Sequence, residues 1–532
     1  MCILPVAGRI KGFTRRVAGD RRGASAVVFT LVFAMLAPAG IGIFDVYVAT
    51  QQRAKLQDAL DAATLYAARS NGQTTAAVDA AGDKALAANL QLISGATLQS
   101  SDFSLSGGKV VAQASVRLPA FAPTVFNHAP ITVNSEVMRG LDKLEVALVL
   151  DNTGSMVLNN SPKLATLKTQ ANILIDKLVA GAAASTDPVP LRISLVPFSN
   201  TVRVQGSTAT NLYNTATHTG PGIPSWVDGR AQAHQLSGSG RDRIFTALGV
   251  DRFSMLKALN NTPWAGCVET RMQPYDVSEA APSLSDGDTL YPPYFWADEP
   301  DTSNQNSYVK DKISGSWFAK EKNQAKYTAS TVDQTGTFTF LGMNFTRGPN
   351  AGCTLQPMIR LTTDTASVKS AINNMTAVGE TNIPMGLVWG WHTLSPNAPL
   401  ADGSSYTTPH LKKIVILMTD GENTNYDSGD SNASHYSGIG FVWQHLTAMT
   451  ETMNFTQRTS AMDGRLAQLC TNMKAKGIVI YTIRVEVNSG PSTLLQDCAT
   501  SPDKFFDVVN VSALGAAFDA IAADITNLRI SH

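Results

Sequence analysis

An uncharged apolar run near the N-terminus constrains this chain more than any other feature. The run GASAVVFTLVFAMLAPAGIGIF extends from Gly23 to Phe44. A helix needs about 20 mostly apolar residues to cross a bilayer, so the run predicts a transmembrane helix that contacts lipid over residues 24–44. Pro38 is compatible with this, since membrane helices tolerate proline. A signal peptide cleaved after residues 37–39 and a buried core helix are the alternatives.

The charges that precede this run predict its orientation. Residues 1–22 form a basic tail in which Asp20 is the only acid. The cationic residues of the tail are Arg9, Lys11, Arg15, Arg16, Arg21 and Arg22. Because Lys and Arg are enriched on the cytoplasmic side of membrane segments, we expect a single-pass chain with a cytoplasmic N-terminus. The bulk of the chain, after Phe44, should then lie outside the cytoplasm.

The positions of the cysteines are consistent with export of the part of the chain after Phe44. Cys2 falls on the predicted cytoplasmic side, and four fall on the other side: Cys267, Cys353, Cys470 and Cys498. An even number in an oxidising compartment indicates two disulfides. Three pairings are possible, and we favour Cys267–Cys353 and Cys470–Cys498 because each closes a loop within one region. A zinc site is disfavoured, since no pair has short metal-like spacing.

Length and charge narrow the class of protein further. The chain has 532 residues, which is too long for one compact core, so we expect two or more domains. The formal net charge is zero, so no nucleic-acid partner is predicted. The sequence has no internal repeat at a fixed period.

Residues 45–140 have the pattern of a helical stalk followed by a small β region. The apolar helix continues to about residue 70 without Gly or Pro, and a second alanine-rich helix follows at 75–92. Alternating residues on both sides of Gly107–Gly108 predict a β-hairpin, and 131–140 predicts a third strand.

From residue 141 to the end of the chain, apolar strands alternate with helices. The predicted strands are 144–150, 191–199, 412–420, 478–487 and 504–511, and the predicted helices are 163–180, 365–375, 382–394, 461–477, 492–499 and 512–530. Ser512 is the expected cap of the last helix. This alternation predicts an α/β fold with a doubly wound, mostly parallel sheet. An insertion at about 201–352 interrupts it; its tryptophans (Trp226, Trp264, Trp296 and Trp317) predict that it is partly folded.

Acidic and hydroxyl side chains follow two of these strands. Asp151 ends the strand VALVLD, with Thr153 and Ser155 after it, and Asp420 ends VILMTD; Thr381 precedes a helix. Ligands of such sheets bind beyond the carboxyl ends of the strands, near the switch point. Carboxylate and hydroxyl oxygens there form the shell that Mg²⁺ prefers. The sequence therefore predicts a metal site made of these five residues.

The same residues also fit simpler interpretations, and the first strand end has an enzymatic look-alike. Asp151 could form an Asx-turn, Thr381 could cap a helix, and Asp420 with Gly421 could form a turn. A strand ending in LDNTGS is faintly similar to the nucleophile motif of haloacid-dehalogenase-type phosphatases, but Thr153 stands where that chemistry needs a second carboxylate. The sequence also lacks a Walker A loop, His-Glu-x-x-His and Gly-x-Ser-x-Gly.

The histidines give no catalytic signal either. All eight are scattered, and His392 and His445 lie on predicted helices, where a structural role is expected. We therefore predict that the chain is not an enzyme and has no catalytic residues.

The three pieces of the predicted metal site resemble those of a von Willebrand factor A domain. Asp-x-Thr-x-Ser after the first strand, a threonine in a middle loop and Thr-Asp-Gly after the fourth strand are similar to its metal-ion-dependent adhesion site. The resemblance implies the strand order 3-2-1-4-5 and hydroxyl ligands from Thr153, Ser155 and Thr381. It also implies that Asp151 and Asp420 hold charge at or next to the metal, which is Mg²⁺, Mn²⁺ or Ca²⁺. One coordination position is left for a carboxylate of a partner.

The N-terminal segment resembles another family. Arg-Arg-Gly, the apolar span, Asp45 and an Ala-rich Leu-Gln-x-Ala-x-Asp-Ala-Ala helix are similar to the start of TadE/TadG-type Flp pilus-assembly proteins. WAGCVETR (264–271), CTLQPMIRLTTD (353–364) and GETNIPMGLVWGWHTLSP (379–396) also resemble TadG-type proteins that carry an A domain. No acid follows Gly23 at the position that type IV prepilins require, so a retained anchor is expected.

Together these resemblances imply a protein of the bacterial inner membrane with a periplasmic bulk. Its metal site would bind protein partners of a Tad pilus or secretion system. A surface-exposed adhesin, in which the aromatic insertion contacts a host or matrix ligand, is the alternative. A metal-dependent hydrolase is the third class, and the missing carboxylate at position 153 argues against it.

Overall fold

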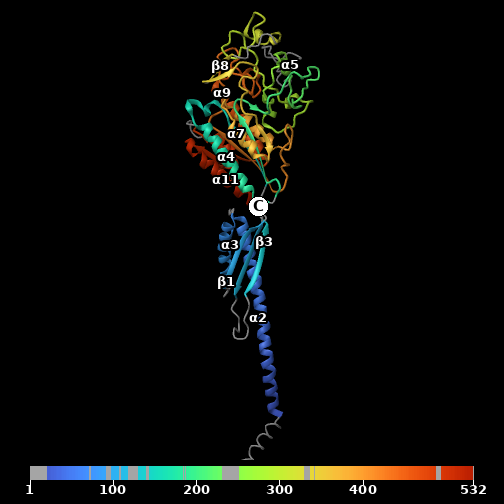
Figure 1. Ribbon diagram of the computed structural model, residues 1–532, viewed down its shortest axis with the longest axis vertical. Coiled ribbons are helices and arrows are strands. Elements are labelled where there is room, and N and C mark those ends of the chain that lie inside the picture. Colours follow the sequence, from blue (N-terminus) through green and yellow to red (C-terminus); the bar gives the residue numbers. More distant parts are fainter. Residues whose placement is uncertain are drawn as a thin grey trace, which may run out of the picture. The chain divides into compact units, whose positions relative to one another are not determined.

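The chain divides into two compact units, Met1–Arg139 and Gly140–His532 (Figure 1). The structure is a computed structural model, and it describes residues 21–70, 74–91, 97–106, 109–117, 130–138, 143–183, 185, 187–230, 251–328, 336–340, 342–486 and 493–530. Cys2, most of the basic tail and the predicted turn at Gly107–Gly108 lie outside these residues.

Helix α2 (Arg21–Arg69) opens the first unit and contains the predicted transmembrane run. Among the described residues it is the one helix that is long and apolar enough to cross a membrane, over Val27–Arg69. Large apolar side chains of the predicted transmembrane run are exposed, with 70% of Phe29 and 78% of Met35 accessible. These are the properties of a membrane anchor, which a signal sequence near an N-terminus shares.

The second half of α2 packs into a small α+β core in the same unit (Figure 1). Helix α3 (Thr75–Leu90) and an antiparallel sheet in the order β1-β2-β3 complete this core. The strands are β1 (Thr97–Ser106), β2 (Lys109–Arg117) and β3 (Ile131–Met138). The core contains Leu56 and Leu60 of α2, Leu86 of α3 and Phe103 of β1. The helices, the hairpin pairing and the third strand predicted for this region are confirmed.

The second unit is built on a parallel sheet with the strand order β13-β12-β11-β4-β5. The strands are β4 (Lys143–Asp151), β5 (Leu191–Phe198), β11 (Leu411–Thr419), β12 (Val479–Val485) and β13 (Phe505–Val508). Strand β10 (Ile359–Thr362) pairs with β5 in the antiparallel sense. Counted in chain order, β10-β5-β4-β11-β12 is the order 3-2-1-4-5. The predicted α/β class with a mostly parallel sheet is confirmed.

Helices cover both faces of this sheet. Helices α4 (Lys163–Ala182), α7 (Thr365–Asn373) and α11 (Leu514–Ile530) pack on the face that contains Val146 and Leu148 of β4. Helices α8 (Ile383–Leu394), α9 (Phe455–Ala475) and α10 (Thr493–Cys498) pack on the face that contains Ala147 and Val149. Both faces of β4 are buried, which explains its continuous apolar run.

Helix α8 lies very close to the sheet. A Cβ atom at Gly386 would lie 2.4 Å from the Phe198 ring. The helix can therefore approach β5 only because this position is glycine.

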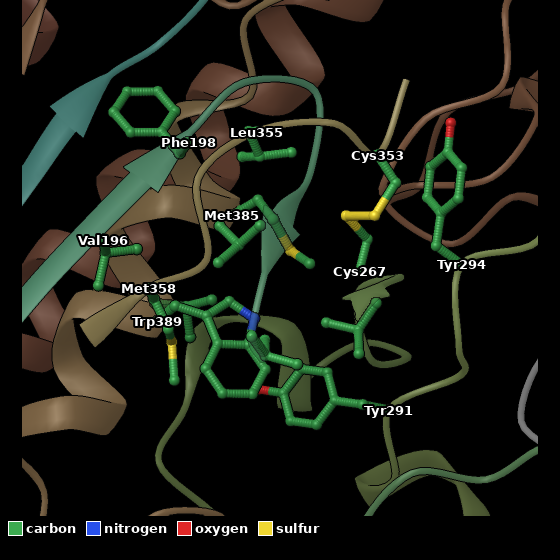
Figure 2. Packing of buried hydrophobic residues seen from close by; sticks show 14 of the residues in the cluster. Val196, Phe198, Cys267, Tyr291, Tyr294, Cys353, Leu355, Met358, Met385 and Trp389 are labelled. Atoms are coloured by element: carbon green, nitrogen blue, oxygen red, sulfur yellow. A yellow bond between two sulfur atoms is a disulfide. The ribbon is translucent and has the colours of Figure 1, made fainter. Parts of the chain in front are cut away.

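The insertion is an extension of the second unit and has few regular elements. Strands β6 (Val202–Arg203) and β7 (Cys267–Val268) continue the sheet beyond β5 in the antiparallel sense. The remaining elements are α5 (Arg252–Ala258), α6 (Trp317–Glu321), β8 (Thr337–Phe340) and β9 (Met343–Thr346). Its aromatic side chains join the core on the α8 side of the sheet. Figure 2 shows Tyr291 beside Trp389 of α8.

Two disulfides hold the second unit, with the pairing favoured from the sequence. Cys267 of β7 is bonded to Cys353 (Figure 2), and Cys470 of α9 is bonded to Cys498 of α10. The first disulfide joins two parts of the chain that lie 86 positions apart. Disulfides of this kind are typical of proteins outside the reducing cytosol.

Several local predictions were wrong. Helix α9 begins at Phe455, because Asn454 and Gln457 form a capping box there. Ser512 does not cap the last helix: Asn510 Oδ1 accepts from the Ser512 backbone N–H, in a 3-10 turn that precedes α11. His445 lies outside a helix and has a left-handed backbone conformation. Strand β10 and the β8–β9 hairpin were not predicted.

Candidate metal centre

The five predicted site residues lie at the carboxyl ends of β4 and β11. These strands are neighbours in the sheet, and the connections that leave them run in opposite directions, to β5 and to β12. This is the switch point at which such sheets bind ligands. Asp151 is the last residue of β4, and Asp420 follows the last residue of β11.

Asp151 is fully buried, and its carboxylate is fixed at both oxygens. The backbone N–H of Thr153 donates to Asp151 Oδ1 at 2.8 Å, which is the predicted Asx-turn. The hydroxyl of Thr419 donates to Asp151 Oδ2 at 2.7 Å. Asp151 makes no ion pair with any described residue.

Thr153 and Ser155 connect this turn to Asp420. The hydroxyls of Thr153 and Ser155 lie 2.9 Å apart, and Ser155 Oγ donates to Asp420 Oδ1 at 2.6 Å. The other carboxylate oxygen, Oδ2, lies 2.6 Å from Lys163 Nζ. The structure therefore brings four of the predicted residues into one hydrogen-bonded chain.

Thr381 belongs to a loop that touches both strand ends. Its backbone N–H donates to the Thr424 hydroxyl at 2.9 Å, and its carbonyl accepts from the Thr424 N–H at 2.9 Å. Thr381 does not cap α8, because Asn382 accepts from the Met385 N–H instead. Its own hydroxyl donates to no described residue. That hydroxyl would lie 3.6 Å from a Cβ atom at Gly421, so it faces the Asp420 loop.

Backbone hydrogen bonds hold these loops in register. The Asn152 N–H donates to the Phe198 carbonyl at 2.8 Å, and its carbonyl accepts from the Val378 N–H at 2.9 Å. The Gly154 N–H donates to the Gly379 carbonyl at 3.1 Å. The positions of the hydroxyl groups are therefore set by the backbone of three separate loops.

The two carboxylates influence each other electrostatically. Burial, together with the negative charge of Asp420, raises the pKa of Asp151 to about 7. A positive ion between two such carboxylates lowers the pKa of both, because it removes the repulsion between them. Asp151 thus has the environment of a carboxylate that needs a cation.

The donor set fits a hard divalent cation. Two carboxylates and three hydroxyls supply oxygen atoms only, and one of those hydroxyls, that of Thr381, has no partner among the described residues. In the part of the chain that the structure describes, no group of three or more His, Cys, Asp or Glu side chains is placed to hold a metal ion. A cation at this rim therefore depends on hydroxyl ligands as well as carboxylates.

Three residues that contact the centre had been given no role from the sequence. Thr419 orients Asp151, and its only signal is its place next to Asp420 in the strand. In the sequence, Lys163 has the pattern of an ordinary surface residue at the start of a helix. Its pairing with Asp420 could therefore not be predicted from the sequence. Met343 of the insertion packs on Gly154, where a Cβ atom would lie 2.3 Å from the methionine Cε.

His392 and His445 both have partners away from this centre. His392 is buried in α8 and lies 2.6 Å from the Tyr291 hydroxyl. Burial lowers its pKa well below the usual value, so it is neutral. His445 pairs with Glu451 at 2.8 Å.

Comparisons with known proteins found only distant likenesses. No protein-family profile and no curated protein sequence matches this chain. The vWF domain of the type V pili tip protein Mfa5 from Porphyromonas gingivalis is 13% identical, with a TM-score of 0.33 over 74% of this chain and 97% of that one. The tip pilin GBS104 from Group B Streptococcus agalactiae is 12% identical, with a TM-score of 0.32 over 72% and 100%.

A third solved structure is the pilus adhesin SpaC from Lactobacillus rhamnosus GG. It is 11% identical, with a TM-score of 0.32 over 82% of this chain and 35% of that one. TM-scores of this size assign neither fold nor function. The fold therefore rests on the strand order of the second unit, and the function on the geometry at the ends of β4 and β11.

Proposed function

We propose that this chain is a membrane-anchored, non-enzymatic protein that binds a protein partner through a divalent cation at this centre. The observation that carries the proposal is the buried pair of carboxylates, Asp151 and Asp420, joined through Thr153 and Ser155 at the switch point of the sheet. Asp151 has no cationic partner among the described residues. A hard cation would supply the missing charge.

The proposed ligands are Asp151, Thr153, Ser155, Thr381 and Asp420. A bound Mg²⁺, Mn²⁺ or Ca²⁺ would supply a Lewis-acidic position for a carboxylate of the partner. The protein residues hold the hydroxyl oxygens in place, and the Asx-turn and Thr419 keep the Asp151 carboxylate oriented.

The proposed setting is the periplasmic side of a bacterial inner membrane. Helix α2 supports an anchor over residues 24–44, and the two disulfides support an oxidising compartment for the second unit. The resemblance of the N-terminal segment to TadE/TadG-type proteins supports a role in a Tad pilus or secretion system. The partner would then be another protein of that system.

The adhesin alternative relied on aromatic contacts from the insertion. Of the four tryptophans of the insertion, Trp264 and Trp296 are buried in the core, and Trp226 and Trp317 are half-buried, so only part of the aromatic surface is available for a ligand. Protease treatment of intact cells separates the two settings. Protection until the outer membrane is opened supports assembly, and digestion on intact cells supports adhesion.

The variant Asp151→Asn tests the metal centre. The amide keeps the volume and the hydrogen bond from Thr153, so the fold should be retained. We expect Mg²⁺ affinity, measured by titration calorimetry on the purified full chain, to fall by roughly 10–100-fold or more, as for other losses at metal sites. Asp503→Asn, at an exposed carboxylate, is the control and should bind Mg²⁺ like the wild type.

Partner binding gives the second readout. Crosslinking in cells should capture the partner in Mg²⁺ and lose it in a chelator or in Asp151→Asn. Equal capture in chelator and in Mg²⁺ would contradict the proposal.

A further inference from the structure

We propose that Lys163 is a tethered cation that competes with the divalent ion for Asp420 and so sets the cation affinity of the centre. This inference rests on the proposed function, because it concerns the regulation of the same site. It assigns a role to a residue outside the five proposed ligands.

The contact is close and protected from solvent. Lys163 Nζ lies 2.6 Å from Asp420 Oδ2, the lysine side chain is 13% exposed, and the Asp420 side chain is not exposed. Such a pair differs from a surface salt bridge, because solvent and salt screen it weakly. The ammonium group therefore neutralises Asp420 effectively.

The lysine stands at a position that does not favour it locally. Lys163 is the first residue of α4, and the N-terminal end of a helix carries partial positive charge. Pro162 precedes it and provides no side-chain cap for the helix. A cation there is disfavoured by the helix itself, so the interaction with Asp420 is what stabilises it.

Asp420 has no free carboxylate oxygen in this arrangement. Ser155 donates to Oδ1, and the ammonium group of Lys163 holds Oδ2. A divalent ion that uses Asp420 must displace one of these partners or share it. Sharing is costly for Lys163, because its positive charge repels the ion at short range.

Displacement of the lysine is sterically possible. Its side chain is flexible, and it is partly exposed, so it can turn to solvent without opening the core. The ammonium group of Lys163 then leaves the carboxylate pair, and one divalent ion takes its place. The protein without metal avoids leaving both buried carboxylates uncompensated, which would cost stability.

Mg²⁺ titration of Lys163→Met tests the inference. The full chain, purified in detergent, is titrated by calorimetry. We expect Lys163→Met to bind Mg²⁺ at least about 10-fold more tightly than the wild type, because the competing charge is gone. Lys163→Arg keeps that charge and should bind like the wild type. Lys177 lies on the same helix as Lys163 and forms an exposed pair with Asp519 of α11, so Lys177→Met is the matched control and should also bind Mg²⁺ like the wild type.

Thermal unfolding adds a readout that does not depend on affinity alone. In chelator, Lys163→Met should unfold at a lower temperature than the wild type, because Asp420 has lost its counter-charge. In Mg²⁺ the order should reverse or the gap should close. If Lys163→Met folds only in Mg²⁺, that result supports the exchange of one cation for another.

Chemical labelling reports the displacement in the unmodified protein. Acylation of lysines, read by mass spectrometry, should increase at Lys163 when Mg²⁺ is added and stay constant at Lys177. The inference would be overturned if the wild type binds Mg²⁺, Lys163→Met binds it with the same affinity, and the labelling of Lys163 does not change. The proposed metal centre would remain valid in that case. If neither the wild type nor Lys163→Met binds Mg²⁺, the proposed function itself fails.

Discussion

Acidic side chains of the insertion lie in its interior, and they make its stability depend on pH. Burial raises the pKa of Glu321 to about 8, that of Glu299 to about 7 and that of Asp298 to about 6. A carboxyl group whose pKa is higher in the folded state stabilises the fold fully below its unfolded pKa. That contribution is lost as the pH rises through the folded value.

Replacement of Glu321 by glutamine should remove part of this dependence. The amide oxygen can still accept from Asn432 Nδ2, which lies 2.9 Å from Glu321 Oε1. The wild-type unfolding temperature should fall between about pH 5 and pH 8, and that of Glu321→Gln should fall less. At pH 8 we expect the variant to be more stable by roughly 1 kcal/mol or more, since one pKa unit corresponds to about 1.4 kcal/mol.

The measurement is thermal unfolding at a series of pH values in chelator. Asp503 has a pKa shifted in the opposite direction from that of Glu321, so Asp503→Asn is a useful comparison. Hydrogen bonds, first that from Ser501, lower the pKa of Asp503 to about 2. Its contribution is present at neutral pH and is lost only as the pH falls through that value. Parallel pH curves for the wild type and Glu321→Gln would contradict the prediction.

At the residue scale, the sequence predicts those site residues that sit at strand ends. Asp151 and Asp420 could be recognised because an apolar strand stops at each of them. Lys163 and Thr419 could not, because their importance depends on which strands become neighbours. Burial of Glu321 was equally invisible, since a glutamate in a polar loop is usually exposed.

At the element scale, the two disulfides differ in the loops that they close. Cys267–Cys353 spans 86 positions and Cys470–Cys498 spans 28. In the chain-entropy description, a longer closed loop restricts the unfolded chain more.

We therefore expect removal of the first disulfide to cost more stability. The variant Cys267→Ala/Cys353→Ala should lose about 4–5 kcal/mol, and Cys470→Ala/Cys498→Ala about 3–4 kcal/mol. Thermal unfolding under non-reducing conditions ranks the two variants against the wild type. The opposite ranking would show that packing around α10 matters more than the length of the loop.

Long elements of the parallel sheet were predicted and the short antiparallel ones were not. The runs that became β4 and β11 are buried on both faces, so their apolar residues are continuous. Strand β10 has four residues, and β8 and β9 form a pair of their own. These strands are too short to show a period, and tertiary pairing decides whether they form. Strand β13 also has four residues, but it lies within the longer predicted run 504–511.

At the scale of the whole molecule, the apolar part of α2 is the candidate membrane anchor. Leu31 and Leu36 are both exposed on its apolar part. We expect Leu31→Arg/Leu36→Arg to release the chain from membranes, because each arginine near the middle of a span costs about 2.5–3.5 kcal/mol. The measurement is the fraction that pellets with membranes after alkaline extraction.

The same helix provides a matched control. Leu65→Arg places the same charge on an exposed position of α2 beyond the apolar run, and it should leave the chain in the pellet. A wild-type chain found in the soluble fraction, with a mass that lacks the run, would support a cleaved signal peptide instead.

The general plan of the molecule followed from patterns that extend over many residues. Apolar length predicted α2, and the alternation of strands and helices predicted the α/β sheet. The path of the chain through the insertion could not be predicted from the sequence, because its core is made of scattered aromatic residues such as Tyr291 and Trp296. Their packing against α8 depends on a surface that exists only once the sheet has formed.

The order of the site residues along the chain determines when during synthesis the centre can form. Ser155 and Asp420 meet although 265 positions separate them. A growing polypeptide contains β4 early, but β11 and the Asp420 that follows it are synthesised only after the whole insertion. Until then Ser155 has no carboxylate to donate to, so a partly synthesised chain lacks the second carboxylate of the proposed metal centre.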